Sequence, residues 1–355
     1  METTILTNFA AMKFLIRLLL LSSAFAVIIL FSGMTNSRKA IRHAFLIPPE
    51  KSVAGILRDL GQPMPDHWLD SPSPEMVNQG SELVYAGRTA GLDGQMTKRQ
   101  SRYFVCADCH NQKREDPDLR IGNPETRLEY SIENEIPFLQ ATTFFGIVNR
   151  ESWYNGDYLK KYGHLVDIAK NNLRESIQVC SIYCSSGRRL DGWEIDAILA
   201  YFWTLALKYE DLEFSESDRN VIAAAYDGGD KNEAIRVLKS GYIQASPAHF
   251  DNGPDDRKKG YGLPGDATRG SKIYNQSCLS CHSKEGPSKY LTLDNSEQSR
   301  QFFRSRMTNW GKLNLYHVVR YGTEPKAGHE AYMPQYPLER MSKQQVEDLR
   351  AYLER

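Results

Sequence analysis

The sequence predicts a mainly α-helical protein in which two tandem domains follow an apolar N-terminal segment. Three features of the 355 residues lead to this prediction. A pair of cysteines followed by a histidine occurs twice, as Cys106-Ala107-Asp108-Cys109-His110 and as Cys278-Leu279-Ser280-Cys281-His282. A capped amphipathic helix is expected downstream of each motif, and a long apolar run precedes both domains.

The cysteine and histidine motif has the spacing of a c-type haem attachment site. Each thiol can bond covalently to one vinyl group of the haem, and the adjacent imidazole then binds the iron. Chance would give the motif about 0.002 times in a chain of this composition. A zinc site would need four ligands at short spacings, and none lies beside either motif. We therefore expect two covalently bound haem c groups, attached through Cys106, Cys109, Cys278 and Cys281, with His110 and His282 as iron ligands.

Residues 1–36 are expected to form a signal anchor. Lys13 and Arg17 precede an apolar run that reaches Phe31, and this run approaches the length needed to span a bilayer. The small-residue pattern Ala24-Phe25-Ala26 lies inside the run rather than after it, which favours an uncleaved anchor over a cleaved signal peptide. Because covalent haem attachment requires export, the folded part is expected on the periplasmic side of the cytoplasmic membrane. If the segment is cleaved, the protein is secreted into the periplasm.

Residues 37–75 are expected to be a tether, and residues 211–262 a connector without haem chemistry. Six prolines forbid long helices in the tether and leave room for one short helix over Ser52–Leu60. The connector should contain two short helices, Asp218–Tyr226 and Lys231–Lys239. Lys+Arg and Asp+Glu balance at 44 each, so nothing indicates a nucleic-acid partner.

The two haem motifs lie in a diverged internal repeat. Short helical patterns that include Gly80 and Gly270 precede the motifs, and helices capped by Asp191 and Ser342 close the two units. This order of helix, haem motif and terminal helix resembles the cytochrome c family, in which the first and last helices cross over the haem. The resemblance implies two cytochrome c-like haem domains, at residues 76–210 and 263–355.

The second unit contains a candidate for the sixth iron ligand. Cytochrome c domains usually supply a methionine shortly before the last helix, and the resemblance places Met333 in that position. A thioether is a soft ligand that raises the reduction potential of the haem. The alternatives are Met307, Met341, His317 and His329.

The first unit has no methionine between His110 and its closing helix. The repeat places the equivalent of Met333 at Ile182, between the two cysteines that the haem motifs do not use. Cys180 is the leading candidate for the distal ligand. The alternatives are Cys184, His164 and Met96.

The two cysteines could also have a purely structural role. They could be buried thiols or form a disulfide, which their four-residue spacing would strain in a helix.

Residues 174–205 resemble the thiosulfate dehydrogenase family of dihaem cytochromes. The similarity rests on Ile177, Cys180, Gly187 and Arg188, followed by a capped helix. In that family the cysteine that matches Cys180 binds the iron of the first haem, so the resemblance implies histidine/cysteine ligation. Cys184 departs from the family, because a serine is expected there.

Two functions are compatible with these features. The first is electron transfer between the haems and a redox partner protein or a membrane respiratory complex. The alternative is a thiosulfate dehydrogenase-like oxidoreductase that acts on thiosulfate or a related sulfur anion at the first haem. Arginines near the predicted site could hold such an anion or a haem propionate, or could be solvated: Arg150, Arg174, Arg188 and Arg189.

Overall fold

The computed structural model describes residues 47–288, 291–307, 311, 313–323 and 333–355. In these ranges the chain is helical, with three isolated β-bridges and no strand, so the prediction of a mainly α-helical fold is confirmed. The predicted anchor, residues 1–36, lies outside the described ranges. Within them, every helix is too short or too polar to cross a membrane.

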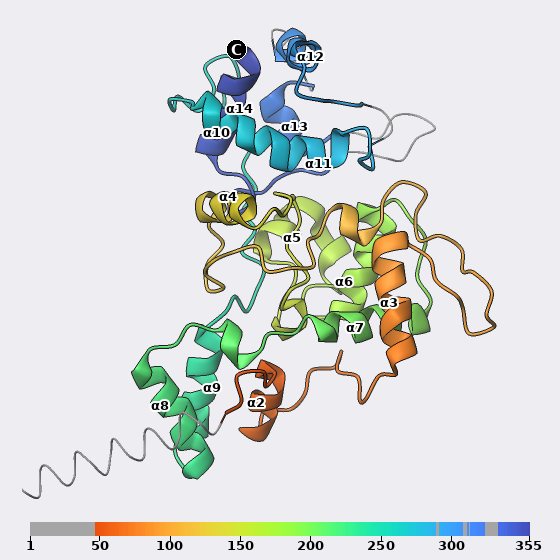
Figure 1. The fold of residues 1–355 in the computed structure, drawn as a ribbon, viewed down its shortest axis with the longest axis vertical. Coiled ribbons are helices and arrows are strands. Elements are labelled where there is room, and N and C mark those ends of the chain that lie inside the picture. The colour runs from red at the N-terminus through yellow and green to blue at the C-terminus, as the bar shows by residue number, and fades with distance from the viewer. Residues whose placement is uncertain (1–46, 289–290, 308–310, 312, 324–332) are drawn as a thin grey trace, which may run out of the picture.

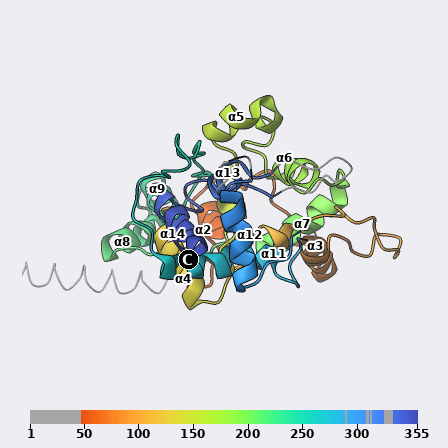
Figure 2. The same ribbon diagram turned by 90° about the horizontal axis from the view of Figure 1, so that it is seen from above.

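The helices form three tiers along the long axis of the molecule (Figure 1). The tier with the second haem motif contains α10 (Ala267–Ile273), α11 (Leu279–His282), α12 (Glu297–Met307), α13 (Leu315–Tyr321) and α14 (Lys343–Glu354). The tier with the first motif contains α3 (Pro74–Ala86), α4 (Pro124–Glu133), α5 (Gly156–Tyr162), α6 (Leu173–Val179) and α7 (Gly192–Thr204). The third tier contains α2 (Val53–Asp59), α8 (Glu216–Ala224) and α9 (Lys231–Ser240). Seen from above, α5 lies at the edge of the molecule (Figure 2).

The same helix crossing occurs in both haem-motif tiers, where α3 packs on α7 and α10 packs on α14. A Cβ added at Gly80 of α3 would lie only 1.8 Å from the carbonyl oxygen of Ala197. A Cβ added at Gly270 of α10 would lie only 1.9 Å from the carbonyl oxygen of Asp348. Ala197 and Asp348 occupy the same position in the sequence repeat. Each crossing therefore needs a glycine at its point of closest approach.

The helix starts follow the local signals in the sequence. Asp191 with Glu194 and Ser342 with Gln345 form the expected capping boxes of α7 and α14. The predicted starts of α7 and α14 are therefore confirmed. Ser73 caps α3 in the same way, and α3 has proline at its first position.

The predicted tether and connector fold together. Buried apolar side chains of the third tier form one core that joins the segment around α2 to α8 and α9: Ile47, Val53, Ile56, Leu57, Leu60, Leu207, Leu212, Ile222, Ala225, Ala234, Val237, Leu238 and Tyr242. The stretch before the first-motif tier is thus held by the stretch after it. Periodicity within each segment predicted the short helices but not this pairing.

The two haem-motif tiers share apolar core. Leu128 of α4 and Phe138 belong to the core around α10, α13 and α14, although both precede the closing helix of the first unit. The backbone N–H of Phe138 donates to the carbonyl oxygen of Gln276 at 2.8 Å. The two units are therefore packed together.

Candidate haem sites

The first haem motif lies on a single tight turn after a long loop. Cys106 begins the turn η1 (Cys106–Asp108), and Asp108 closes it by accepting a hydrogen bond from the backbone N–H of Val105 at 2.8 Å. Gly87 ends α3 in the left-handed region, at φ 68°, and so separates this helix from the motif. In the second unit, α10 instead runs almost directly into the motif through η7 (Tyr274–Cys278).

The side chain of His110 is oriented as an iron ligand requires. Its Nδ1 lies 2.6 Å from the carbonyl oxygen of Thr142, which leaves Nε2 available to a metal. The ring stacks on Phe144, with 4.3 Å between ring centroids, and Phe144 packs in turn on Phe202 of α7. Burial lowers the pKa of His110 to about 4, so the imidazole is neutral at neutral pH.

The second motif repeats this arrangement. Nδ1 of His282 lies 3.0 Å from the carbonyl oxygen of Leu291, again leaving Nε2 available. Cys278 ends the π-turn η7, and Cys281 and His282 lie on α11. Burial lowers the pKa of His282. Both sites thus present a neutral imidazole with a fixed ring, which fits the proximal ligand of a haem.

Met333 lies half-buried against the apolar core of the second unit. Its backbone is fixed by Thr323, since the N–H of Met333 donates to Thr323 Oγ1 at 2.7 Å and the N–H of Thr323 donates to the Met333 carbonyl at 2.9 Å. Met307 and Met341 are buried within the same core.

Of the two histidine alternatives in the second unit, His317 lies within the described ranges. His317 stacks on Tyr321 and contacts Arg257 through Nδ1. His329 lies outside the described ranges.

A cavity of about 360 Å³ lies beside the first motif. Cys106, Cys109 and His110 line one side of it, and Cys180 and Cys184 line another. The structure therefore brings both spare cysteines to the predicted haem position. Among the other distal candidates, the His164 side chain is 98% exposed and paired with Asp167, and Met96 is 59% exposed.

Cys180 and Cys184 begin and end a π-turn, η4 (Cys180–Cys184), that continues α6. Hydrogen bonding with Cys184 and burial raise the pKa of the Cys180 thiol well above its ordinary value. Cys184 is exposed, and none of the six cysteines forms a disulfide in the structure. Gly187 follows the turn, where a Cβ would lie 2.4 Å from the carbonyl oxygen of Gln100. This close approach explains why glycine stands there.

Of the four candidate anion-binding arginines, Arg150 lines the cavity. Its Nη2 donates to Thr142 Oγ1 at 3.0 Å, next to the carbonyl that orients His110. Arg188 is paired with the fully buried Glu194 at 2.5 Å, and Arg174 is paired with Asp196 at 2.6 Å. Arg189 is exposed. Arg150 is therefore the best placed of these four side chains to contact a group in the cavity.

The two haem motifs contact each other. Cys281 Sγ lies 3.8 Å from the carbonyl oxygen of Asp108, which sits between the two cysteines of the first motif. Pro334, the neighbour of Met333, also lines the first cavity. The two candidate sites are therefore adjacent although their motifs are far apart in the sequence.

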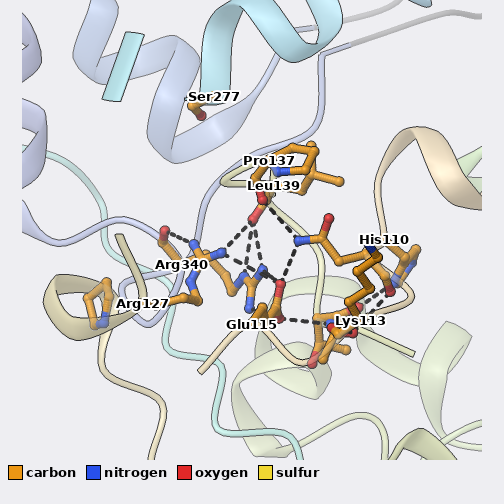
Figure 3. Close-up of polar contacts among 12 residues, drawn as sticks. His110, Lys113, Glu115, Arg127, Pro137, Leu139, Ser277 and Arg340 are labelled. Carbon is orange, nitrogen blue, oxygen red and sulfur yellow. Dashed lines mark hydrogen bonds and ion pairs between the residues drawn. The ribbon is translucent and has the colours of Figure 1, made fainter. Parts of the chain in front are cut away.

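A buried ionic cluster also joins the two units (Figure 3). Glu115, just after the first motif, accepts hydrogen bonds from Nη1 and Nη2 of Arg340 at 2.5 and 2.9 Å. Arg127 lies 3.8 Å from the same carboxylate and stacks over Phe138. Burial alone would raise the pKa of Glu115, but Arg340 and Arg127 lower it to about 2. The bridge joins the loop before α14 to the first motif.

Sequence reasoning did not identify the Glu115 cluster or the aromatic wall of the cavity. Tyr154, Tyr158 and Tyr162 line the cavity from α5 and the residues just before it. Their spacing of four residues was a signal that could have been found. No local signal marked Glu115 and Arg340, because 225 positions separate them.

Comparison with known families supports a cytochrome at the C-terminus. Residues 265–353 match the family model described as cytochrome C oxidase, cbb3-type, subunit III. This stretch contains the second motif, α10, α14 and Met333. The match supports a c-type cytochrome with covalently bound haem c and a role in electron transfer. No curated protein and no solved structure matches the chain.

Proposed function

We propose that this c-type cytochrome carries two haems and transfers electrons between them on the periplasmic side of the cytoplasmic membrane. Cys106 and Cys109 would attach the first haem, and Cys278 and Cys281 the second. His110 and His282 would bind the irons from one side, and Cys180 and Met333 from the other. Residues 1–36 would anchor the protein, and a redox partner protein or membrane respiratory complex would exchange electrons with it.

The observation that carries this proposal is the contact between Cys281 Sγ and the Asp108 carbonyl, at 3.8 Å. A cysteine that attaches one haem would thus touch the segment that attaches the other. Haem iron supplies one-electron chemistry when bound. The protein contributes fixed imidazoles through the Thr142 and Leu291 carbonyls, and a shared core that keeps the two motifs together.

The proposed ligands also predict a direction of electron flow. A thiolate donates charge to iron and favours the ferric state, whereas a thioether raises the potential. With Cys180 on the first haem and Met333 on the second, the first haem has the lower potential. Electrons that arrive at the first unit would then pass to the second unit and on to a partner docked there.

A flash experiment tests transfer between the haems. One electron is injected into the fully oxidised protein by a photoreductant, and the absorbance of the two haems is followed. We expect redistribution at a rate that is independent of protein concentration. A variant with Cys106→Ala and Cys109→Ala should lack this phase. A rate that rises in proportion to protein concentration would contradict intramolecular transfer.

A second candidate function is oxidation of thiosulfate or a related sulfur anion at the first haem. The observation in its favour is the cavity of about 360 Å³, into which Arg150 brings a cationic group. Anaerobic thiosulfate should then reduce the haems of the wild type. Arg150→Gln should slow this reduction while the spectrum of the oxidised haems stays the same. Haems that remain oxidised in excess thiosulfate would exclude this activity.

A further inference from the structure

Two thiols line the first cavity, and the proposed haem ligation uses one of them, Cys180. Cys180 and Cys184 lie on the same π-turn and both line the cavity. A distal ligand requires one sulfur atom, so the second thiol calls for a separate explanation.

The π-turn brings these two thiols together. In an α-helix, residues four apart have Cα atoms about 6 Å apart, near the upper part of the disulfide range. A π-turn is wider and rises less per residue, so residues four apart lie closer than in an α-helix. The N–H of Ser185 donates to the Cys180 carbonyl at 2.9 Å, which is the five-residue hydrogen bond of this geometry. The π-turn therefore places the two cysteines at a spacing that falls within the Cα range of disulfides.

The turn is held from both ends. Gln178 forms two hydrogen bonds with the backbone of Leu190, at 2.7 and 3.0 Å. Ser181 is buried and donates to the Arg188 carbonyl at 2.7 Å. Ser101 donates from another loop to the Ser185 carbonyl at 2.5 Å. The backbone that carries the two cysteines is therefore supported independently of any bond between them.

We propose that Cys180 and Cys184 form a reversible dithiol/disulfide couple that passes two electrons to the haem pair. The proposal rests on the two-haem function above, because two ferric irons can accept one electron each. External thiols are the substrate class, since Cys184 is exposed and open to thiol–disulfide exchange.

The step balances in atoms and electrons. The Sγ atoms of Cys180 and Cys184 would form the S–S bond, Cys180 would give up its place as an iron ligand, and the Cys184 proton would leave to water. The two electrons would reduce the two ferric haems, one electron each. Two external thiols then reopen the disulfide through attack at Cys184 and leave as a disulfide, which restores the dithiol.

The test counts electrons in the holoprotein. The protein is reduced anaerobically with a phosphine and dithionite, freed of reductant and titrated with ferricyanide. Wild type should consume about four equivalents per chain, two from the haems and two from the thiols, and Cys184→Ser about two. Haem absorbance gives the haem number in the same samples. If the protein carries one haem instead of two, wild type and Cys184→Ser each consume one equivalent of ferricyanide less, but the difference between them stays at about two equivalents. Failure of the two-haem proposal can therefore be told apart from failure of the dithiol proposal.

A mass measurement identifies the bond directly. Trypsin releases residues 175–188 as one peptide that contains both cysteines. This peptide should take two maleimides from the reduced protein and none from the oxidised protein, where it should be two hydrogens lighter. Glutathione should also reduce the ferric haems of wild type at least ~10-fold faster than those of Cys184→Ser.

Three results would overturn the inference. The first is equal ferricyanide consumption by wild type and Cys184→Ser. The second is a doubly alkylated peptide 175–188 from the oxidised protein. The third is equal rates of haem reduction by glutathione in wild type and Cys184→Ser.

Discussion

Glu115→Gln should cause a large loss of stability by breaking the bridge between the two haem-motif units. The substitution keeps the shape of the side chain but removes its charge. Glu115 is 1% exposed and accepts hydrogen bonds from Arg340, Asn111 Nδ2 and the N–H of Thr143. The variant leaves the guanidinium of Arg340 buried against a neutral amide, with Arg127 also close by.

Two arguments give the size and the sign of the change in stability. Removing one partner of a buried ion pair typically costs about 3–5 kcal/mol, because the other charge stays buried without compensation. The pKa of Glu115 falls from 4.5 to about 2. The direction of this shift favours the ionised, folded state. We therefore expect the free energy of unfolding to fall by about 3–5 kcal/mol.

Guanidinium denaturation followed by far-UV circular dichroism measures this loss at equal haem content. Glu297→Gln is the matched control, because Glu297 pairs with Arg300 and Arg304 on the exposed face of α12. Removing such a surface pair should leave the midpoint of guanidinium denaturation unchanged. A double variant with Glu115→Gln and Arg340→Met should lose less than the sum of the single variants, because Arg127 is then the one buried cation left beside the neutral amide instead of two.

The pH dependence has a definite sign. Because the folded pKa of Glu115 is depressed, its contribution is fully present above pH 4.5 and is lost as the pH falls towards 2. The difference in stability between wild type and Glu115→Gln should therefore shrink below pH 4.5. If Glu115→Gln and Glu297→Gln had the same midpoint of guanidinium denaturation at pH 7, the stabilising role of the Glu115–Arg340 bridge would be refuted.

Three other predictions concern the haem ligands and the helix crossing. Met333→Ala should lower the potential of the second haem and make it high-spin or recruit another ligand; an unchanged visible spectrum would count against Met333. Cys180→Met should raise the potential of the first haem in a redox titration, and a wild-type first haem with the higher potential would reverse the proposed flow. Gly270→Ala should cost about 1–3 kcal/mol in denaturation, because its Cβ would meet the Asp348 carbonyl. Gly192→Ala, which has open space around its Cβ, is the control, and equal midpoints would contradict the close crossing.

Local signals in the sequence predicted much of the helical architecture. A cap such as Asp191 or Ser342 acts on backbone groups three residues away, so sequence alone is enough to find it. The two cysteine and histidine motifs are equally local, because each lies within five consecutive residues. The structure adds the orientation of His110, which depends on the Thr142 carbonyl 32 residues away.

The remaining features depend on contacts between distant segments. Glu115 and Arg340 look like ordinary charged residues in the sequence, and only packing of the two units buries them together. The contact of Cys281 with Asp108 likewise follows from how the units meet. The third tier combines the predicted tether with the connector for the same reason, since neither segment buries its apolar face alone.

The central claim is that each cysteine and histidine motif holds one haem. The most direct test is the pyridine haemochrome assay, referred to protein concentration and checked by intact mass. We predict two haems per chain in the wild type. Removal of either cysteine pair, Cys106 with Cys109 or Cys278 with Cys281, should leave one. A wild-type protein with one haem per chain would contradict the account.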